Sequence, residues 1–132
     1  MAPAIAAGAL ASIRHLKRSD LERARHRERV QTLKTMLEEV GLPVMDNPSH
    51  IVPVMIGDPV HCKAVTDTLL THYGLYVQPI NYPTVPRGTE RMRLTPSPVH
   101  NDAQMAYLVG ALSDLWAACP VANGQYVRLA AE

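Results

Sequence analysis

The sequence predicts an α+β fold in which a small antiparallel sheet is covered by helices on one face. Three short extended segments, at 51–56, 75–80 and 91–95, are rich in β-branched residues or alternate apolar with polar ones. Apolar residues at helical spacing fill most of the chain around these segments. The last two extended segments flank a proline-containing loop at 81–90, and they most simply pair as antiparallel neighbours.

The composition is that of an ordinary globular domain. Of 132 residues, 47% are apolar and 19% are charged, and the net charge of +1 indicates neither a nucleic-acid nor a membrane partner. Two cysteines, Cys62 and Cys119, are too few for a disulfide framework and lack the Cys-x-x-Cys spacing of zinc sites. These features favour a reducing compartment, the bacterial cytoplasm. No apolar run reaches the roughly 20 residues that span a bilayer.

The first segment, MAPAIAAGALASIRHLKRS, allows two interpretations. It is rich in alanine, contains three basic residues and has no acidic one, which is compatible with a mitochondrial transit peptide. The mitochondrial matrix is therefore the alternative location. Leu10, Ile13 and Leu16 recur at helical spacing, however, and this favours an amphipathic helix over residues 4–18.

Start and stop signals place the next elements. Ser19 and Glu22 have the spacing of a capping box at the start of a second helix, in which the serine hydroxyl caps the first turn and the glutamate reaches back. Gly41 ends that helix as a left-handed cap. After the strand at 51–56, Asp58 caps a third helix that has Pro59 at its first position.

The last helix follows Asn101, and Gln104 stands at the capping-box position. Pro120 ends this last helix, because proline cannot continue a helix. Its expected buried face consists of apolar residues at helical spacing: Leu108, Leu112, Leu115 and Trp116. Residues 121–132 are expected to form a flexible tail. Earlier in the chain, the third helix is expected to end near Gly74.

The third extended segment carries an unusual pair of arginines. Side chains alternate between the two faces of a strand, so Met92 and Leu94 are expected to face the helices, and Arg91 and Arg93 the other side. A guanidinium offers a planar fork that matches a carboxylate with two parallel hydrogen bonds. The pattern predicts a carboxylate receptor; the alternative is a sheet surface whose arginines meet only solvent or nearby acids.

The run INYPTVPRGTERMRLTPSPVHN resembles the C-terminal signature of the α-oxoamine synthases. The segments AAGALASIRHLKRS and SHIVPVMIGDP support the resemblance, in the order of that family. It implies the small C-terminal domain of an aspartate-aminotransferase-like (fold type I) enzyme, a homodimer that uses pyridoxal phosphate. Residues 1–18 would then pack on a large domain upstream of this chain, and residues 19–120 would form the small domain.

The member most closely resembled condenses glycine with succinyl-CoA to give 5-aminolevulinate, CoA and CO2, the first step of haem and tetrapyrrole biosynthesis. The resemblance assigns the glycine carboxylate to Arg93 and the succinyl carboxylate to Thr84. It also makes Asn81 a candidate substrate-pocket residue. The alternatives are a related synthase with another acyl-CoA, or a stand-alone regulatory module that binds a small carboxylate or haem.

The residues that hold the cofactor in this family are expected upstream of the chain. Lys17, Lys34 and Lys63 lie in helical contexts, and none stands in the cofactor-lysine motif of the family. No glycine-rich phosphate-binding loop occurs either. The chain is therefore expected to contain no catalytic residue, to bind no pyridoxal phosphate by itself, to be inactive alone, and to self-associate through exposed surfaces.

Cys119 and Pro120 form the minimal Cys-Pro haem regulatory motif, in which a thiolate ligates ferric haem, and His61 is a candidate second ligand. The alternative is a cysteine at a helix end followed by a proline that stops the helix. The histidines show no pair at metal-binding spacing, so no metal site is predicted.

Overall fold

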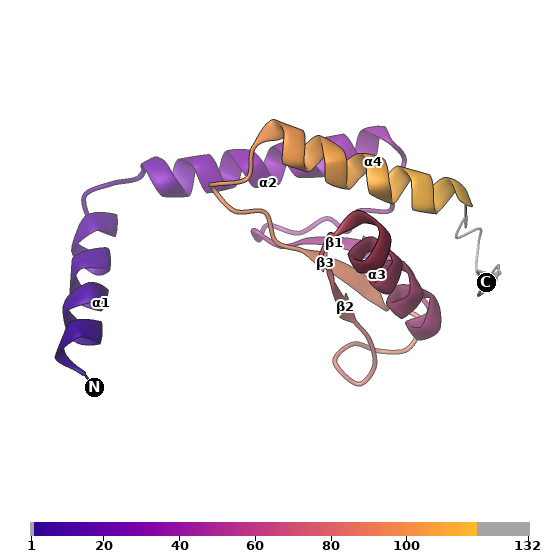
Figure 1. The fold of residues 1–132 in the computed structure, drawn as a ribbon, viewed down its shortest axis with the longest axis horizontal. Coiled ribbons are helices and arrows are strands. Elements are labelled where there is room, and N and C mark those ends of the chain that lie inside the picture. The colour runs from indigo at the N-terminus through magenta and orange to yellow at the C-terminus, as the bar shows by residue number, and fades with distance from the viewer. Residues whose placement is uncertain (1, 119–132) are drawn as a thin grey trace.

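A computed structural model describes residues 2–118 of the chain. It contains a three-stranded antiparallel sheet in the order β1-β3-β2, formed by β1 (Val52–Met55), β2 (Gln78–Ile80) and β3 (Arg91–Leu94). The helices are α1 (Pro3–Leu16), α2 (Leu21–Glu39), α3 (Pro59–Tyr73) and α4 (Asp102–Ala118) (Figure 1). The predicted α+β class and the antiparallel pairing of the last two strands are confirmed.

Helices cover one face of the sheet, as predicted. Val52 pairs with Leu94 and Val54 with Met92, so these four buried side chains share a face. The same core cluster contains the buried residues of α2, α3 and α4, which therefore lie on that face. The residues that the helices contribute are Val30, Leu33, Leu37, Cys62, Val65, Leu69, Met105, Val109, Ala111, Leu112 and Leu115.

Two helices begin as their start signals predict. The Asp58 carboxylate accepts a hydrogen bond of 2.7 Å from the backbone N–H of His61 at the start of α3. At the start of α4, the side chains of Asn101 and Gln104 each accept from the backbone N–H of the other residue, at 2.9 and 3.0 Å. These reciprocal bonds fix the direction in which α4 crosses the core.

The start of α2 differs from the prediction. Asp20, with no side-chain capping bond, stands at the N-cap, and the Ser19 hydroxyl donates to the Glu22 carboxylate at 2.7 Å. The ring Nε2 of His15 also donates to Glu22, at 2.6 Å. The backbone N–H of Ser19 donates to the carbonyl of His15 at 3.0 Å instead of to the Glu22 carboxylate, so the predicted capping box does not form.

The second strand is shorter than the predicted segment 75–80, because it begins at Gln78. The N–H of Leu75 donates to the carbonyl of Leu69, so Leu75 belongs to the C-terminal cap of α3. Gly74, in the left-handed conformation with φ 66°, allows this turn. The strand therefore starts only where the chain comes alongside Arg93.

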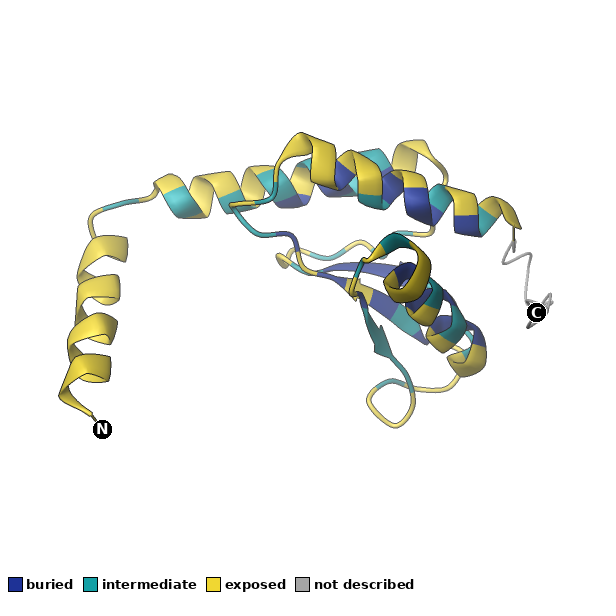
Figure 2. Cartoon of the chain, in the orientation of Figure 1, coloured by how far each residue is buried: buried dark blue, intermediate teal, exposed yellow. Residues whose placement is uncertain are grey.

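The first helix extends away from the rest of the fold (Figure 1) and has no buried residue (Figure 2). Its large apolar side chains are exposed: Ile5 by 65%, Leu10 by 47%, Ile13 by 55% and Leu16 by 41%. The predicted helix over 4–18 is thus observed at Pro3–Leu16, with an uncovered apolar surface. None of the described helices is both long and apolar enough to cross a membrane.

Candidate functional site

Arg93 lies on the central strand of the sheet. Its Cα pairs with Pro53 of β1 on one side and with Gln78 of β2 on the other, so hydrogen-bonded neighbours hold its backbone from both sides. The residue is exposed, whereas Met92 and Leu94 beside it are buried at 0% and 4% exposure. Within residues 2–118 no hydrogen bond or ion pair engages the Arg93 guanidinium, which is therefore open to an external anion.

The other two arginines of this region have local contacts. The Arg91 guanidinium is half-buried and donates to the carbonyl and the hydroxyl of Thr89, at 2.9 and 3.2 Å. Arg87 lies in the loop between β2 and β3, with its guanidinium 4.9 Å from the centre of the Tyr82 ring, a cation–π arrangement. Of the three arginines, Arg93 alone has neither kind of contact within residues 2–118, which distinguishes it from Arg91 on the same strand.

A cavity of about 330 Å³ opens beside Arg93. It lies at the end of the sheet where β3 leaves the ladder, between α2, α4 and the segment before β2. Its wall is mostly apolar, with polar side-chain groups from six residues. The lining consists of Leu33, Leu75, Tyr76, Val77, Gln78, Arg93, Leu94, Thr95, Pro96, His100, Gln104, Met105 and Leu108.

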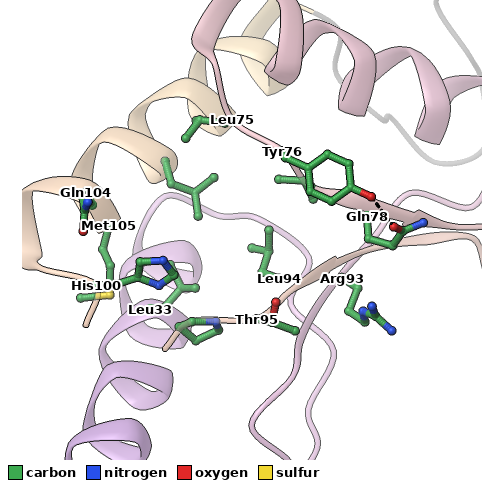
Figure 3. A pocket seen from close by; sticks show the side chains of 13 residues that line it. Leu33, Leu75, Tyr76, Gln78, Arg93, Leu94, Thr95, His100, Gln104 and Met105 are labelled. Atoms are coloured by element: carbon green, nitrogen blue, oxygen red, sulfur yellow. Dashed lines mark hydrogen bonds between the residues drawn. The ribbon is translucent and has the colours of Figure 1, made fainter. Parts of the chain in front are cut away.

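Several polar groups of this wall are already engaged. The ring of His100 accepts from the N–H of Ser97 at 3.0 Å, and the Gln104 amide oxygen accepts from Asn101 at 3.0 Å. Figure 3 shows Arg93 on the side of Gln78, with its guanidinium directed away from His100 and Gln104. The arrangement therefore provides one free cation at the edge of a mostly apolar cavity, which suits a small carboxylate.

Gln78, His100 and Gln104 line the cavity but are not among the site residues predicted from the sequence. Gln78 could have been found from the strand register, because it stands directly opposite Arg93. Its amide is held by the hydroxyl of Tyr76 at 2.6 Å and by its own bond to the Pro79 carbonyl at 3.2 Å. His100 and Gln104 carry no such signal, since tertiary packing brings their helix end to the strand.

Thr84 and Asn81, predicted from the resemblance as substrate residues, do not line this cavity. Asn81 follows β2, three residues after Gln78, so the chain passes it about 10 Å farther along the sheet at roughly 3.3 Å per residue. The Asn81 amide nitrogen donates to the Pro59 carbonyl at 3.1 Å. Thr84 is exposed and its N–H donates to the Asn81 carbonyl at 3.0 Å. The roles of Arg93, Thr84 and Asn81 stay predictions.

Two residues were predicted as haem ligands, His61 and Cys119, and the structure describes only the first. His61 lies in the first turn of α3 with 8% exposure, so its ring would have to leave the core to ligate haem. Cys119 lies outside the described residues. The neighbouring Cys62 is fully buried, and burial raises the pKa of its thiol to about 11. Over residues 2–118, no three His, Cys, Asp or Glu side chains gather to hold a metal ion.

The family model described as aminotransferase class I and II matches residues 1–112. The chain belongs to the class I and II aminotransferase family. Among curated proteins, it is 59% identical over 121 residues to the 5-aminolevulinate synthase of Rhizobium meliloti, covering 92% of this chain and 30% of that protein. It is 55% identical over 126 residues to 5-aminolevulinate synthase 1 of Cereibacter sphaeroides, covering 95% and 31%.

Two solved structures share the fold of this chain. A serine palmitoyltransferase of S. paucimobilis with bound PLP and myriocin superposes with a TM-score of 0.66 at 27% identity, covering 74% of this chain and 25% of that one. The 8-amino-7-oxononanoate synthase of Francisella tularensis gives 0.70 at 16% identity, covering 83% and 32%. The predicted resemblance is confirmed, and the chain spans about 30% of the length of the curated relatives it matches.

Aminotransferase-family enzymes that use pyridoxal phosphate attach it to a lysine, and the three lysines of this chain do not fit that role. Lys34 Nζ donates to the Asn47 carbonyl at 2.6 Å, and Lys63 pairs with Asp67 at 2.6 Å. Lys17 is exposed just beyond α1. None of them lines the cavity beside Arg93. Arg93 is thus the free cation at this cavity within residues 2–118, and no lysine lines the cavity with it.

Proposed function

We propose that this chain is the substrate-binding C-terminal part of a 5-aminolevulinate synthase. In this proposal the complete enzyme is a pyridoxal-phosphate-dependent acyltransferase of the bacterial cytoplasm that condenses glycine with succinyl-CoA, releasing CoA and CO2. One observation carries the assignment: the Arg93 guanidinium is free, exposed and mounted on the central strand beside a cavity. The two bacterial synthases with 59% and 55% identity support the choice of substrates.

Arg93 binds the carboxylate of glycine through two parallel N–H···O hydrogen bonds. Hydrogen bonds to charged groups contribute about 1.5–3 kcal/mol, and the fork fixes the plane of the carboxylate as well as its position. With the carboxylate held, the bonds at the glycine α-carbon point in defined directions toward the rest of the active site. The ladder on both sides of β3 keeps the Arg93 backbone in place during binding.

Thr84 binds the carboxylate end of the succinyl group, and Asn81 lies near that end of the pocket. Both residues lie away from Arg93 along the sheet. This separation suits two binding positions, because the glycine carboxylate and the succinyl carboxylate must not share one cation. Thr84 is exposed on its loop. Its hydroxyl can enclose the succinyl group only when the remainder of the enzyme closes the pocket around that group.

The remainder of the enzyme is required for activity. Residues 1–18 pack on a large domain that holds pyridoxal phosphate and pairs with a second subunit, while residues 19–120 form the small domain. The exposed apolar side chains of α1 support this arrangement, since such a surface needs a partner. The chain alone should be inactive and should self-associate. Sedimentation of residues 1–132 against residues 19–132 tests this, and a monomer in both cases contradicts it.

The substrates are tested with the complete protein that carries this chain. It should form 5-aminolevulinate from glycine and succinyl-CoA, and turn over acetyl-, pimeloyl- and palmitoyl-CoA poorly. The Asn81 amide and the Thr84 hydroxyl can bond to a terminal carboxylate, and these short polar side chains offer little apolar surface to a long acyl chain. Preference for one of the other acyl donors would contradict the proposal and favour a related synthase.

A further inference from the structure

Glu90 is a fully buried carboxylate at 0% exposure, at the end of the loop 81–90. One of its oxygens, Oε2, accepts a hydrogen bond of 2.8 Å from the backbone N–H of Gly88. The other, Oε1, has no hydrogen-bond partner within the described residues, and no cation of residues 2–118 pairs with the carboxylate. Burying such a group is costly, so its retention needs a reason.

The backbone carbonyl of Glu90 bonds to a second turn, the one that follows β1. Its carbonyl accepts hydrogen bonds from the N–H groups of Ile56 and Gly57, both at 2.9 Å, directly after β1. Gly57 and Gly88 both have positive φ, 81° and 83°, and a Cβ built on Gly57 would lie 3.5 Å from the Gly88 carbonyl oxygen. Two tight turns therefore meet at Glu90, which binds one through its side chain and the other through its backbone.

The opposite end of the same loop is anchored on the same turn. The Asn81 amide donates to the carbonyl of Pro59, which stands at the first position of α3. Between these anchors the loop carries Thr84, whose N–H bonds only to the Asn81 carbonyl. The position of Thr84 therefore depends on the two ends of its loop, whereas Arg93 depends on the strand ladder.

We infer that Glu90 is a positioning residue for the acyl-donor side of the site: its side chain holds the Gly88 turn within the loop 81–90, next to the backbone bonds that join the loop to the β1–α3 turn, and so places Thr84. This inference rests on the function proposed above. Because Arg93 is held by β1 and β2, loss of the Glu90 side chain should disturb acyl-donor binding and leave glycine binding unchanged. A residue that merely stabilised the fold would affect both substrates.

The test uses the complete enzyme with Glu90→Ala and Glu90→Gln, and with Glu39→Ala as the matched control at an exposed glutamate. Losing the charge-assisted bond to Gly88 should raise the KM for succinyl-CoA about 10-fold, with the glycine Kd changed by less than about twofold. Glu90→Gln keeps an oxygen that accepts the Gly88 N–H, so it should restore most of the affinity. The control should match the wild type.

Hydrogen–deuterium exchange supplies a readout that does not depend on turnover. The Gly88 amide and the loop around Thr84 should exchange faster in Glu90→Ala than in Glu90→Gln, with no change in β3. Equal loss of both substrates, or unaltered loop exchange, would overturn the inference. If Glu90→Ala does not fold, Glu90→Asp, whose carboxylate is one methylene shorter, must show the same selective rise in KM.

The proposed function and the role of Glu90 are refuted by different results. A wild-type enzyme that makes no 5-aminolevulinate from glycine and succinyl-CoA refutes the proposed function, and the acyl-donor role of Glu90 is refuted with it. An active wild type whose Glu90→Ala variant binds succinyl-CoA normally refutes only the inference about Glu90.

Discussion

Replacing Arg93 by leucine isolates the contribution of one guanidinium to substrate binding. The side chain is exposed and has no partner within residues 2–118, so its removal leaves no buried donor or acceptor unsatisfied in the protein. The free energy of unfolding should therefore change by less than about 0.5 kcal/mol. The ligand, in contrast, loses a bidentate pair of charge-assisted bonds, at about 1.5–3 kcal/mol, which corresponds to a glycine Kd about 10- to 150-fold higher.

Arg91 provides the matched control, because it is an arginine two residues away on the same strand. Its guanidinium bonds to Thr89, so Arg91→Leu should lower stability by about 1 kcal/mol while glycine affinity changes little. Arg93→Lys keeps the charge without the planar fork and should fall between wild type and Arg93→Leu. Calorimetric glycine titrations of the complete enzyme measure all four proteins. Unchanged glycine affinity in Arg93→Leu, or a larger loss in Arg91→Leu, would show that Arg93 does not bind the glycine carboxylate.

Three further predictions concern the described fold. Burial raises the pKa of Cys62 to about 11, so at pH 8 iodoacetamide should alkylate it about 100-fold more slowly than in urea; equal rates would contradict its burial. Asn101→Ala should lower the unfolding free energy by about 1 kcal/mol in urea titrations, since the reciprocal bond with Gln104 is lost. The hydrogen bond from His15 lowers the pKa of Glu22 from 4.5 to about 2, so its stabilising contact should be complete above pH 4.5 and lost as the pH falls through about 2; an NMR midpoint near 4.5 would contradict it.

Local signals in the sequence were sufficient for most of the elements. The caps at Asp58 and Asn101 were predicted because each depends on residues three positions apart, whose geometry the helix itself dictates. The inward direction of Met92 and Leu94 was predicted because alternation along a strand is fixed by its backbone. The family resemblance could be recognised because its signature is one continuous run of residues that includes β3.

The missed features depend on residues distant in the chain or on competition between partners. The backbone N–H of Ser19 bonds to the carbonyl of His15 in the preceding helix, so the capping box expected with Glu22 does not form. Alternation along the strand places Arg91 and Arg93 on one face and does not distinguish their contacts, yet only Arg91 reaches Thr89. Glu90 gave no signal at all, because its burial results from the meeting of two turns that lie far apart in sequence.

A crystal structure of the complete enzyme with glycine bound would test the role of Arg93 most directly. Two guanidinium nitrogens of Arg93 should lie about 2.7–2.9 Å from the two carboxylate oxygens of glycine, with the β3 backbone unmoved. A glycine carboxylate held by another residue, with Arg93 still facing solvent, would show that Arg93 is not the carboxylate receptor.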